Sequence, residues 1–197
     1  MEIVSFSFPP IHTRRLTLGD LAPSDAPVMY RYRTDPEVSR YQGWMPSSIK
    51  EVTDFIRDLG NTSPGTPGRW YQVGIFLTAT GELIGDYGFH TPQAEPRQAE
   101  IGITLDSPWQ QKGLAREAME AMLAYLFDTL DRHRIYASLD PRNVRSLSLM
   151  QRMGLRKEAH LVQAIRFKGE WADDVIFAIL QKEWQQRSGP HDPLRKQ

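Results

Sequence analysis

Residues Leu105–Ala115 read LDSPWQQKGLA, and this stretch decides the fold more than any other part of the chain. A predicted strand, Gln98–Leu105, ends where the stretch begins, and a predicted helix starts at Gly113 after a short loop. One face of that helix carries apolar residues at helical spacing, namely Ala115, Ala118, Met119, Met122, Leu126 and Leu130. A strand, a loop and a helix in immediate succession are typical of an α/β or α+β domain.

The predicted helix start is suited to binding phosphate. Unpaired N–H groups and the positive end of the helix dipole lie there. Gly113 and Ala115 leave room for a pyrophosphate, while Lys112 and Arg116 add positive charge. An ordinary strand-to-helix loop would show the same spacing, so the residues alone leave that alternative open. The sequence contains neither GxxxxGK[ST] nor GxGxxG, which excludes the commonest nucleotide-binding loops.

Outward from this stretch, the hydrophobic pattern predicts a mixed sheet. Further strands are expected at Arg15–Leu18, Tyr71–Leu77, Glu82–Phe89 and Arg134–Leu139. Helices are expected at about Pro23–Arg33, Ser48–Leu59 and Val144–Met153, before a terminal hairpin that turns at Lys168-Gly169. Gly85 and Gly88 within a strand predict a bulge or a close approach of two backbones.

Composition excludes several classes of protein. The 197 residues include 24 Lys+Arg and 24 Asp+Glu, so the formal net charge is zero and neither nucleic acid nor a membrane is an expected partner. Cysteine is absent, which excludes disulfides and thiolate chemistry, and five scattered histidines give no metal-binding pattern. With no signal peptide or apolar span in the sequence, the expectation is a cytoplasmic protein.

The segment Gln110–Ala115 (QQKGLA) matches the Q/R-x-x-G-x-G/A acetyl-CoA signature of the GNAT N-acetyltransferases. Other segments resemble the RimJ/RimL-type branch, in the same order along the chain. Thr13–Leu16 resembles its opening, Asp35–Val38 its first helix and Ala99–Gly102 its central strand. Asn143–Leu155 matches its N-x-x-S-x-x-L…G-F/L segment. The resemblance implies a single domain over residues 1–197, with a core of about 11–184 and a polar tail of 185–197. It also implies a strongly twisted mixed sheet with helices on both faces.

In that fold two parallel strands, here Gln98–Leu105 and Arg134–Leu139, splay apart around acetyl-CoA, and no metal is required. The pantetheine arm would bind main-chain groups left unpaired at Ile103, Thr104 and Leu105. The pyrophosphate would bind a loop made of Gln110, Gln111, Lys112, Gly113, Leu114, Ala115 and Arg116. Asn143 and Ser146 would contact the arm or ordered water, although both residue types are also common helix caps.

Acetyl transfer to an amine requires a neutral amine, an oxyanion donor and a proton for the leaving thiolate. Glu100 is the candidate base, acting through water, and partial burial would raise its pKa. A counter-charge for the amine or a structural ion pair are alternatives. A backbone N–H near Ile103 would bind the oxyanion. Many GNAT enzymes place a tyrosine where this chain has Met150, so Ser146, Ser148 or solvent would have to protonate the thiolate.

The acceptor site is expected between the first two helices and the terminal hairpin. Tyr41, Trp44, Trp171 and Asp174 are its candidates, because aromatic rings and carboxylates suit a cationic amine, although surface packing would explain them equally. The predicted function is N-acetylation of a protein N-terminus or a small amine by a monomer or homodimer. The alternative is a catalytically silent acyl-CoA-binding module, which Met150 favours.

Overall fold

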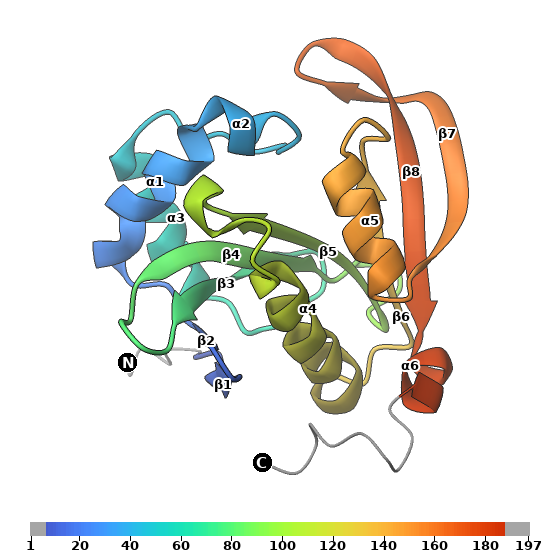
Figure 1. The fold of residues 1–197 in the computed structure, drawn as a ribbon, viewed down its shortest axis with the longest axis horizontal. Coiled ribbons are helices and arrows are strands. Elements are labelled where there is room, and N and C mark those ends of the chain that lie inside the picture. The colour runs from blue at the N-terminus through green and yellow to red at the C-terminus, as the bar shows by residue number, and fades with distance from the viewer. Residues whose placement is uncertain (1–6, 188–197) are drawn as a thin grey trace.

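The computed structural model describes residues 7–187 and contains one mixed sheet of eight strands (Figure 1). The strand order is β1-β2-β3-β4-β5-β6-β8-β7. The strands are β1 Ile11–His12, β2 Leu16–Gly19, β3 Trp70–Leu77, β4 Leu83–His90, β5 Gln98–Leu105, β6 Arg134–Leu139, β7 Arg156–Phe167 and β8 Glu170–Leu180. Among these strands β5 and β6 are parallel, and the other neighbouring pairs are antiparallel. The predicted mixed sheet and the hairpin turn at Lys168-Gly169 are therefore confirmed.

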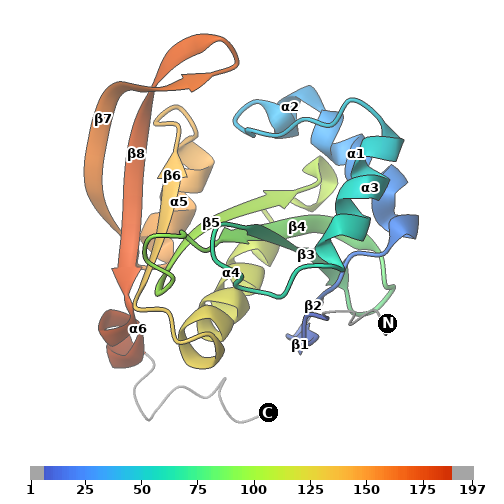
Figure 2. The same ribbon diagram turned by 180° about the vertical axis from the view of Figure 1, so that it is seen from behind.

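Helices cover both faces of the sheet, as the views from opposite sides show (Figures 1 and 2). One face carries α4, Leu114–Ala124, and α5, Val144–Arg152; the other carries α1, Ala26–Thr34, and α3, Ile49–Leu59. The short α2, Pro36–Ser39, follows α1, and α6, Gln181–Arg187, follows β8. A π-helical turn, Tyr125–Thr129, continues α4.

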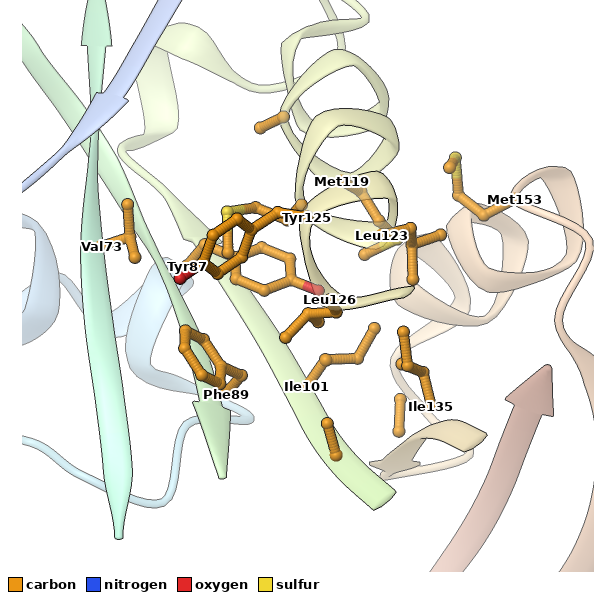
Figure 3. Packing of buried hydrophobic residues seen from close by; sticks show 14 of the residues in the cluster. Val73, Tyr87, Phe89, Ile101, Met119, Leu123, Tyr125, Leu126, Ile135 and Met153 are labelled. Carbon is orange, nitrogen blue, oxygen red and sulfur yellow. The ribbon is translucent and has the colours of Figure 1, made fainter. Parts of the chain in front are cut away.

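Each helical layer buries its own apolar stripe. On the α4 face, Met119 and Leu123 of α4 and Leu126 of the π-turn pack toward Ile101 and Phe89 of the sheet (Figure 3). The second cluster joins α1 and α3 to the sheet through the side chains of Leu21, Ala26, Met29, Tyr32, Val52, Ile56, Leu59 and Leu83. Ser48 caps α3 by accepting from the N–H of Glu51 at 3.2 Å, as the sequence predicted.

Three segments differ from the prediction. The segment Asp35–Val38, expected in the first helix, forms the start of a second one, in which Asp35 accepts from the N–H of Glu37. Strand β1 was not predicted, because two residues carry no periodicity. The polar tail was expected from Gln185, but Gln181–Arg187 is helical because Trp184 is buried against Phe127, with ring centroids 5.9 Å apart. The rest of that tail lies outside the described residues.

Strand β4 carries the bulge that its glycines predicted. The register with β3 shifts between Ile75, which pairs with Gly85, and Phe76, which pairs with Leu83. A Cβ atom on Gly85 would lie 2.2 Å from the carbonyl oxygen of Thr104. Only glycine therefore allows β4 and β5 to approach this closely.

The parallel strands separate half-way along their length. Strand β5 pairs with β6 at Gln98↔Arg134, Ala99↔Ile135 and Glu100↔Tyr136, and the paired positions stop there. Beyond this point β5 stays paired with β4 as far as Leu105, while β6 stays paired with β8. A gap therefore opens on the β6 side of β5, which confirms the expected splay.

Candidate active site

The N–H and C=O groups of successive β5 residues point alternately toward β4 and toward this gap. The N–H of Asp106 donates to the carbonyl of Ile84 on the β4 side, at 2.9 Å. Because successive strand residues point their N–H and C=O groups to opposite sides, Leu105 and Ile103 present theirs to the gap. The same alternation directs Thr104 toward β4. The expectation that the Thr104 backbone is free for a ligand is therefore wrong, whereas Ile103 and the N–H of Leu105 fit it, the Leu105 carbonyl being bonded to Gln110.

The side chain of Gln110 connects the loop after β5 to the end of β5 and to α5. Gln110 donates from Nε2 to the carbonyl of Leu105 at 2.9 Å and accepts at Oε1 from Arg145 of α5 at 3.0 Å. Gln111 and Gly113 have φ values of 60° and 77°, so the chain turns into α4 through two left-handed residues. A Cβ atom on Gly113 would meet nothing closer than 3.5 Å. Backbone conformation, rather than lack of space, therefore requires this glycine.

The residues of the predicted phosphate-binding loop differ in which of their groups a ligand could reach. Their exposed members are Gln111, Lys112, Gly113 and Arg116. The Lys112 ammonium lies over the ring of Trp109, 4.7 Å from its centroid. The side chain of Leu114 is buried in the main core, so only its main chain is available to a ligand.

Asn143 and Ser146 lie at the first turn of α5. Asn143 accepts at Oδ1 from the N–H of Ser146 at 3.2 Å, which makes Asn143 the N-cap of the helix. Ser146 is half-buried one turn before Met150, whose side chain is buried in the main core. Met150 carries no transferable proton, so Ser146 and Ser148 remain the candidate donors on this helix.

Glu100 lies at the fork of the splay, on the face opposite the main core. Its half-buried carboxylate lies directly across from His90 of β4, and Oε2 accepts from the Tyr136 hydroxyl at 3.5 Å. Burial raises the pKa of Glu100, and the negative charge of Asp174 raises it further, against opposing effects of His90 and Tyr136. A carboxyl group with a raised pKa is a better proton acceptor near neutral pH.

Two consecutive aspartates of β8 have different surroundings. Asp174 is buried and accepts from the Ser138 hydroxyl at 2.7 Å, which places it on the same face as Glu100. Asp173 points the other way and pairs with His160 at 2.8 Å. Of the two, Asp174 therefore belongs to the polar face around Glu100.

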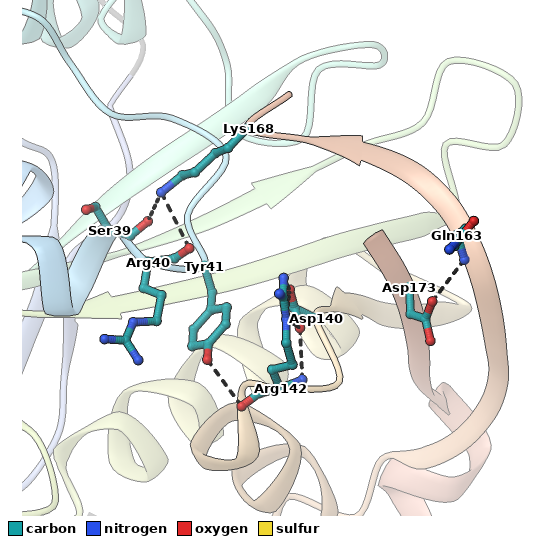
Figure 4. A network of polar contacts seen from close by, with 8 residues as sticks. All are labelled: Ser39, Arg40, Tyr41, Asp140, Arg142, Gln163, Lys168 and Asp173. Atoms are coloured by element: carbon teal, nitrogen blue, oxygen red, sulfur yellow. Dashed lines mark hydrogen bonds and ion pairs between the residues drawn. The ribbon is translucent and has the colours of Figure 1, made fainter. Parts of the chain in front are cut away.

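A hollow of about 400 Å³ lies between the chain after α2, the loop after β6 and the tip of the β7–β8 hairpin. Tyr41 and Trp171, two of the predicted acceptor residues, line it. The Tyr41 hydroxyl donates to the carbonyl of Arg142 at 3.4 Å, which connects the α2 segment to the β6–α5 loop (Figure 4).

These features match a known enzyme family. The family model described as the acetyltransferase (GNAT) domain matches residues 15–156. The chain belongs to the GNAT acetyltransferase family. The match favours an enzyme over a silent binding module.

Individual relatives agree with this GNAT assignment. The chain is 32% identical over 175 residues to an uncharacterized N-acetyltransferase, p20, of Bacillus licheniformis, covering 88% of this chain and 97% of that one. It is 31% identical over 118 residues to the [ribosomal protein uS5]-alanine N-acetyltransferase of Escherichia coli, covering 59% and 61%. A crystal structure of a GNAT acetyltransferase from Bacillus anthracis superposes with a TM-score of 0.79 at 26% identity, covering 89% of this chain and all of the other.

Trp44, the third aromatic residue predicted for the acceptor site, does not line the hollow. Its indole N–H donates to Glu51 at 2.9 Å, its ring packs on Phe55 with centroids 4.7 Å apart, and the Arg33 guanidinium lies over it. Trp44 therefore does not join Tyr41 and Trp171 around the hollow, because its ring packs within the helical layer.

Several residues around Glu100 and the hollow escaped sequence analysis. Tyr136 meets Glu100 only through the parallel register of β5 and β6, and Arg40, Arg142 and Lys168 meet at the hollow from three distant segments. His90 stacks on Trp70, with ring centroids 5.4 Å apart, and also lies across from Glu100 in the register of β4 with β5. These residues could have been found only from the pairing of the strands, which the local sequence does not encode.

Within residues 7–187 no helix has the length and apolarity that a membrane span needs. The same range holds no cluster of three or more His, Asp or Glu side chains that could bind a metal ion.

In this acetyltransferase, Asp174→Asn is expected to move the low-pH limb of kcat/KM to lower pH. Asp174 raises the pKa of Glu100, so removing its charge lowers that pKa and leaves the base ionised in more acidic solution. Asparagine keeps an oxygen to accept from Ser138. The measurement is kcat/KM from pH 5 to 9, with Asp173→Asn as the matched control, for which the limb should not move. An unmoved limb in Asp174→Asn would mean that Glu100 does not set it.

Proposed function

We propose that this acetyltransferase transfers the acetyl group of acetyl-CoA directly to a primary amine. The observation that carries the proposal is the end of β5–β6 pairing at Glu100 and Tyr136. It leaves main-chain groups of Ile103 and the N–H of Leu105 open to the amides of a pantetheine arm, and a half-buried carboxylate lies at the fork.

The donor side of the proposal uses the chain's own loop and helix start. Free N–H groups at the start of α4, with Lys112 and Arg116 beside them, would hold the pyrophosphate. Ser146, on the first turn of α5, would lie along the arm. Acetyl-CoA would supply an activated thioester, and no metal enters the proposal.

The reaction assigns one role to each group. Glu100 takes the amine proton through water, so that the nitrogen lone pair can attack the acetyl carbon. A backbone N–H near Ile103 stabilises the oxyanion. The new C–N bond forms as the C–S bond breaks, and the thiolate takes a proton from Ser146 or from solvent. A thiolate is a tolerable leaving group near neutral pH, so buried Met150 does not prevent turnover.

The acceptor is proposed to be a protein N-terminus or a small amine. The name of the E. coli relative describes alanine acetylation on a ribosomal protein, which supports the first class for that relative. We also propose a cytoplasmic location, where ribosomal proteins are found, a single domain, and a monomer or homodimer.

The test is a panel of amines incubated with acetyl-CoA while free thiol is measured. Amine-dependent thiol release supports the proposal. Protection of the protein by coenzyme A against thermal unfolding, with no thiol release for any amine, would instead support the silent binding module that Met150 favours.

A further inference from the structure

Gly102 of β5 is a glycine that neither its backbone conformation nor its packing requires. Its φ lies outside the left-handed region, and an added Cβ atom would meet nothing within 4 Å among residues 7–187. Gly85 on the neighbouring strand differs, because the close approach of β4 and β5 leaves no room there for a Cβ atom. Glycine weakens the interior of a strand, and where packing does not explain it, it often marks the close approach of a ligand. Gly102 is half-buried, so part of its surface is accessible to one.

The open space over Gly102 lies beside the candidate base. Glu100 and Gly102 share a face of β5 and are roughly 7 Å apart along the strand. Gly88 of β4, which pairs with Gly102, is covered, because a Cβ atom on it would lie 2.7 Å from Oε1 of Gln72. The Gln72 amide is itself held by its bond to the buried carboxylate of Asp86. Gln72 stops more than 4 Å short of the Cβ position of Gly102, so it bounds the space on the β4 side and leaves it open.

The acceptor has to cross this space. The side chains of Ile101 and Ile103 pack with the main core, so the α4 face of β5 is closed. In the proposed reaction the thioester lies in the gap beside Ile103, and the amine gives its proton to Glu100 on the opposite face. The nitrogen therefore lies between Glu100 and Ile103, over Gly102. The carbon that bears the nitrogen, and any group attached to that carbon, lies next to the same position.

We propose that the space over Gly102 holds a substituent on the carbon that bears the reacting amine. The acceptor class is then an amine branched at that carbon, such as the N-terminal residue of a peptide that begins with a side chain rather than with glycine. A methyl group at the Cβ position would clash with none of the described residues, since none has an atom within 4 Å. The inference rests on the proposed function and narrows its acceptor class. A side chain at position 102 would fill the space and reject branched amines.

Pairs of amines that differ in branching test the proposal. One pair is a tripeptide that begins with alanine and the same tripeptide beginning with glycine; the other is sec-butylamine and butylamine. Binding to protein saturated with coenzyme A is measured by calorimetry, and kcat/KM is measured by thiol release. In at least one pair, the wild type should use the branched member at least as well as the unbranched one.

Gly102→Val should lower kcat/KM for the branched member about tenfold or more relative to the unbranched member. The affinity for coenzyme A should not change, and the melting temperature should not fall, because valine suits a strand. Gly102→Ala should act in the same direction more weakly, and it keeps the test valid if the valine variant does not fold. Gly19→Val is the matched control and should leave the ratio unchanged. Gly19 also lies in a strand, β2, where an added Cβ atom would meet no described atom within 4 Å, and β3 and β4 separate β2 from β5.

The outcomes separate this inference from the proposed function. Equal losses for branched and unbranched amines in Gly102→Val, or a wild-type preference for the unbranched member of both pairs, overturn the inference. Thiol release with any amine would still leave the proposed function standing in those cases. A preference for branched amines in binding that Gly102→Val abolishes, with no thiol release for any amine, would overturn the proposed function and leave the role of Gly102 standing.

Discussion

Glu100→Gln is expected to lower kcat about 100-fold near pH 7 and to leave the dissociation constant of coenzyme A nearly unchanged. Glutamine keeps the shape of the side chain at the fork of β5 and β6 but cannot accept a proton. Because the amine loses its proton unaided as the pH rises, the defect should shrink toward about pH 9–10. The measurement is kcat and kcat/KM for both proteins from pH 6.5 to 9.5.

The thermal stability of Glu100→Gln distinguishes a role of Glu100 as the base from a structural role. Burial raises the pKa of Glu100 in the folded protein, so the folded state binds that proton more tightly than the unfolded state. The stability that this group contributes is present below the ordinary glutamate pKa and is lost as the pH rises through the raised value. At pH 7 the neutral glutamine should therefore melt no lower than the wild type.

Other outcomes for Glu100→Gln have distinct meanings. A higher KM with an unchanged kcat would identify Glu100 as the counter-charge for the amine. A lower melting temperature, with both constants following the folded fraction, would identify a structural residue. Wild-type kcat at every pH would remove Glu100 from the chemistry.

Gly113→Val should weaken coenzyme A binding at least tenfold, about 1.4 kcal/mol. Gly113 has a φ of 77°, which a β-branched residue adopts only with strain. Relaxation of that strain would turn the N–H groups at the start of α4 away from the pyrophosphate, and the branched side chain would occupy its space. Calorimetry with coenzyme A gives the dissociation constant, and melting curves give the folded fraction.

Gly81→Val controls for backbone strain. Gly81 has a φ of 72° in the β3–β4 turn, where an added Cβ atom would meet nothing within 4 Å. It should carry a similar conformational cost and bind coenzyme A as the wild type does. Wild-type affinity in a folded Gly113→Val protein would place the pyrophosphate elsewhere.

The parts of the fold that depend on residues adjacent in the sequence were predictable. The QQKGLA loop, β5 and the start of α4 follow each other in the chain, so periodicity and one motif locate them. The family resemblance then supplied the pairing of β5 with β6, which periodicity alone does not contain. Gly85 predicted its close approach because no other residue type fits there.

The surroundings of the hollow could not be predicted from local sequence, because they depend on contacts between distant segments. Alternation puts Asp173 and Asp174 on opposite faces of β8 but does not say which face meets Glu100. The contact of Lys168 with Ser39 spans 129 residues, and nothing local to either residue predicts it. Trp44 lies near the expected site in sequence, but its ring is held by Phe55 in the helical layer.

The open half of β5 has a consequence for how this enzyme can diverge. Ile103 and the N–H of Leu105 would hold the donor through main-chain groups that nearly every amino acid possesses, so substitutions there leave donor binding largely intact. The hollow, in contrast, is lined by side chains such as Arg40, Tyr41 and Lys168, where a single substitution changes the charge or shape that an entering molecule meets. Mutation can therefore exchange one acceptor for another while the donor stays the same, and a duplicated gene could acquire a new substrate without passing through a form that no longer binds the donor.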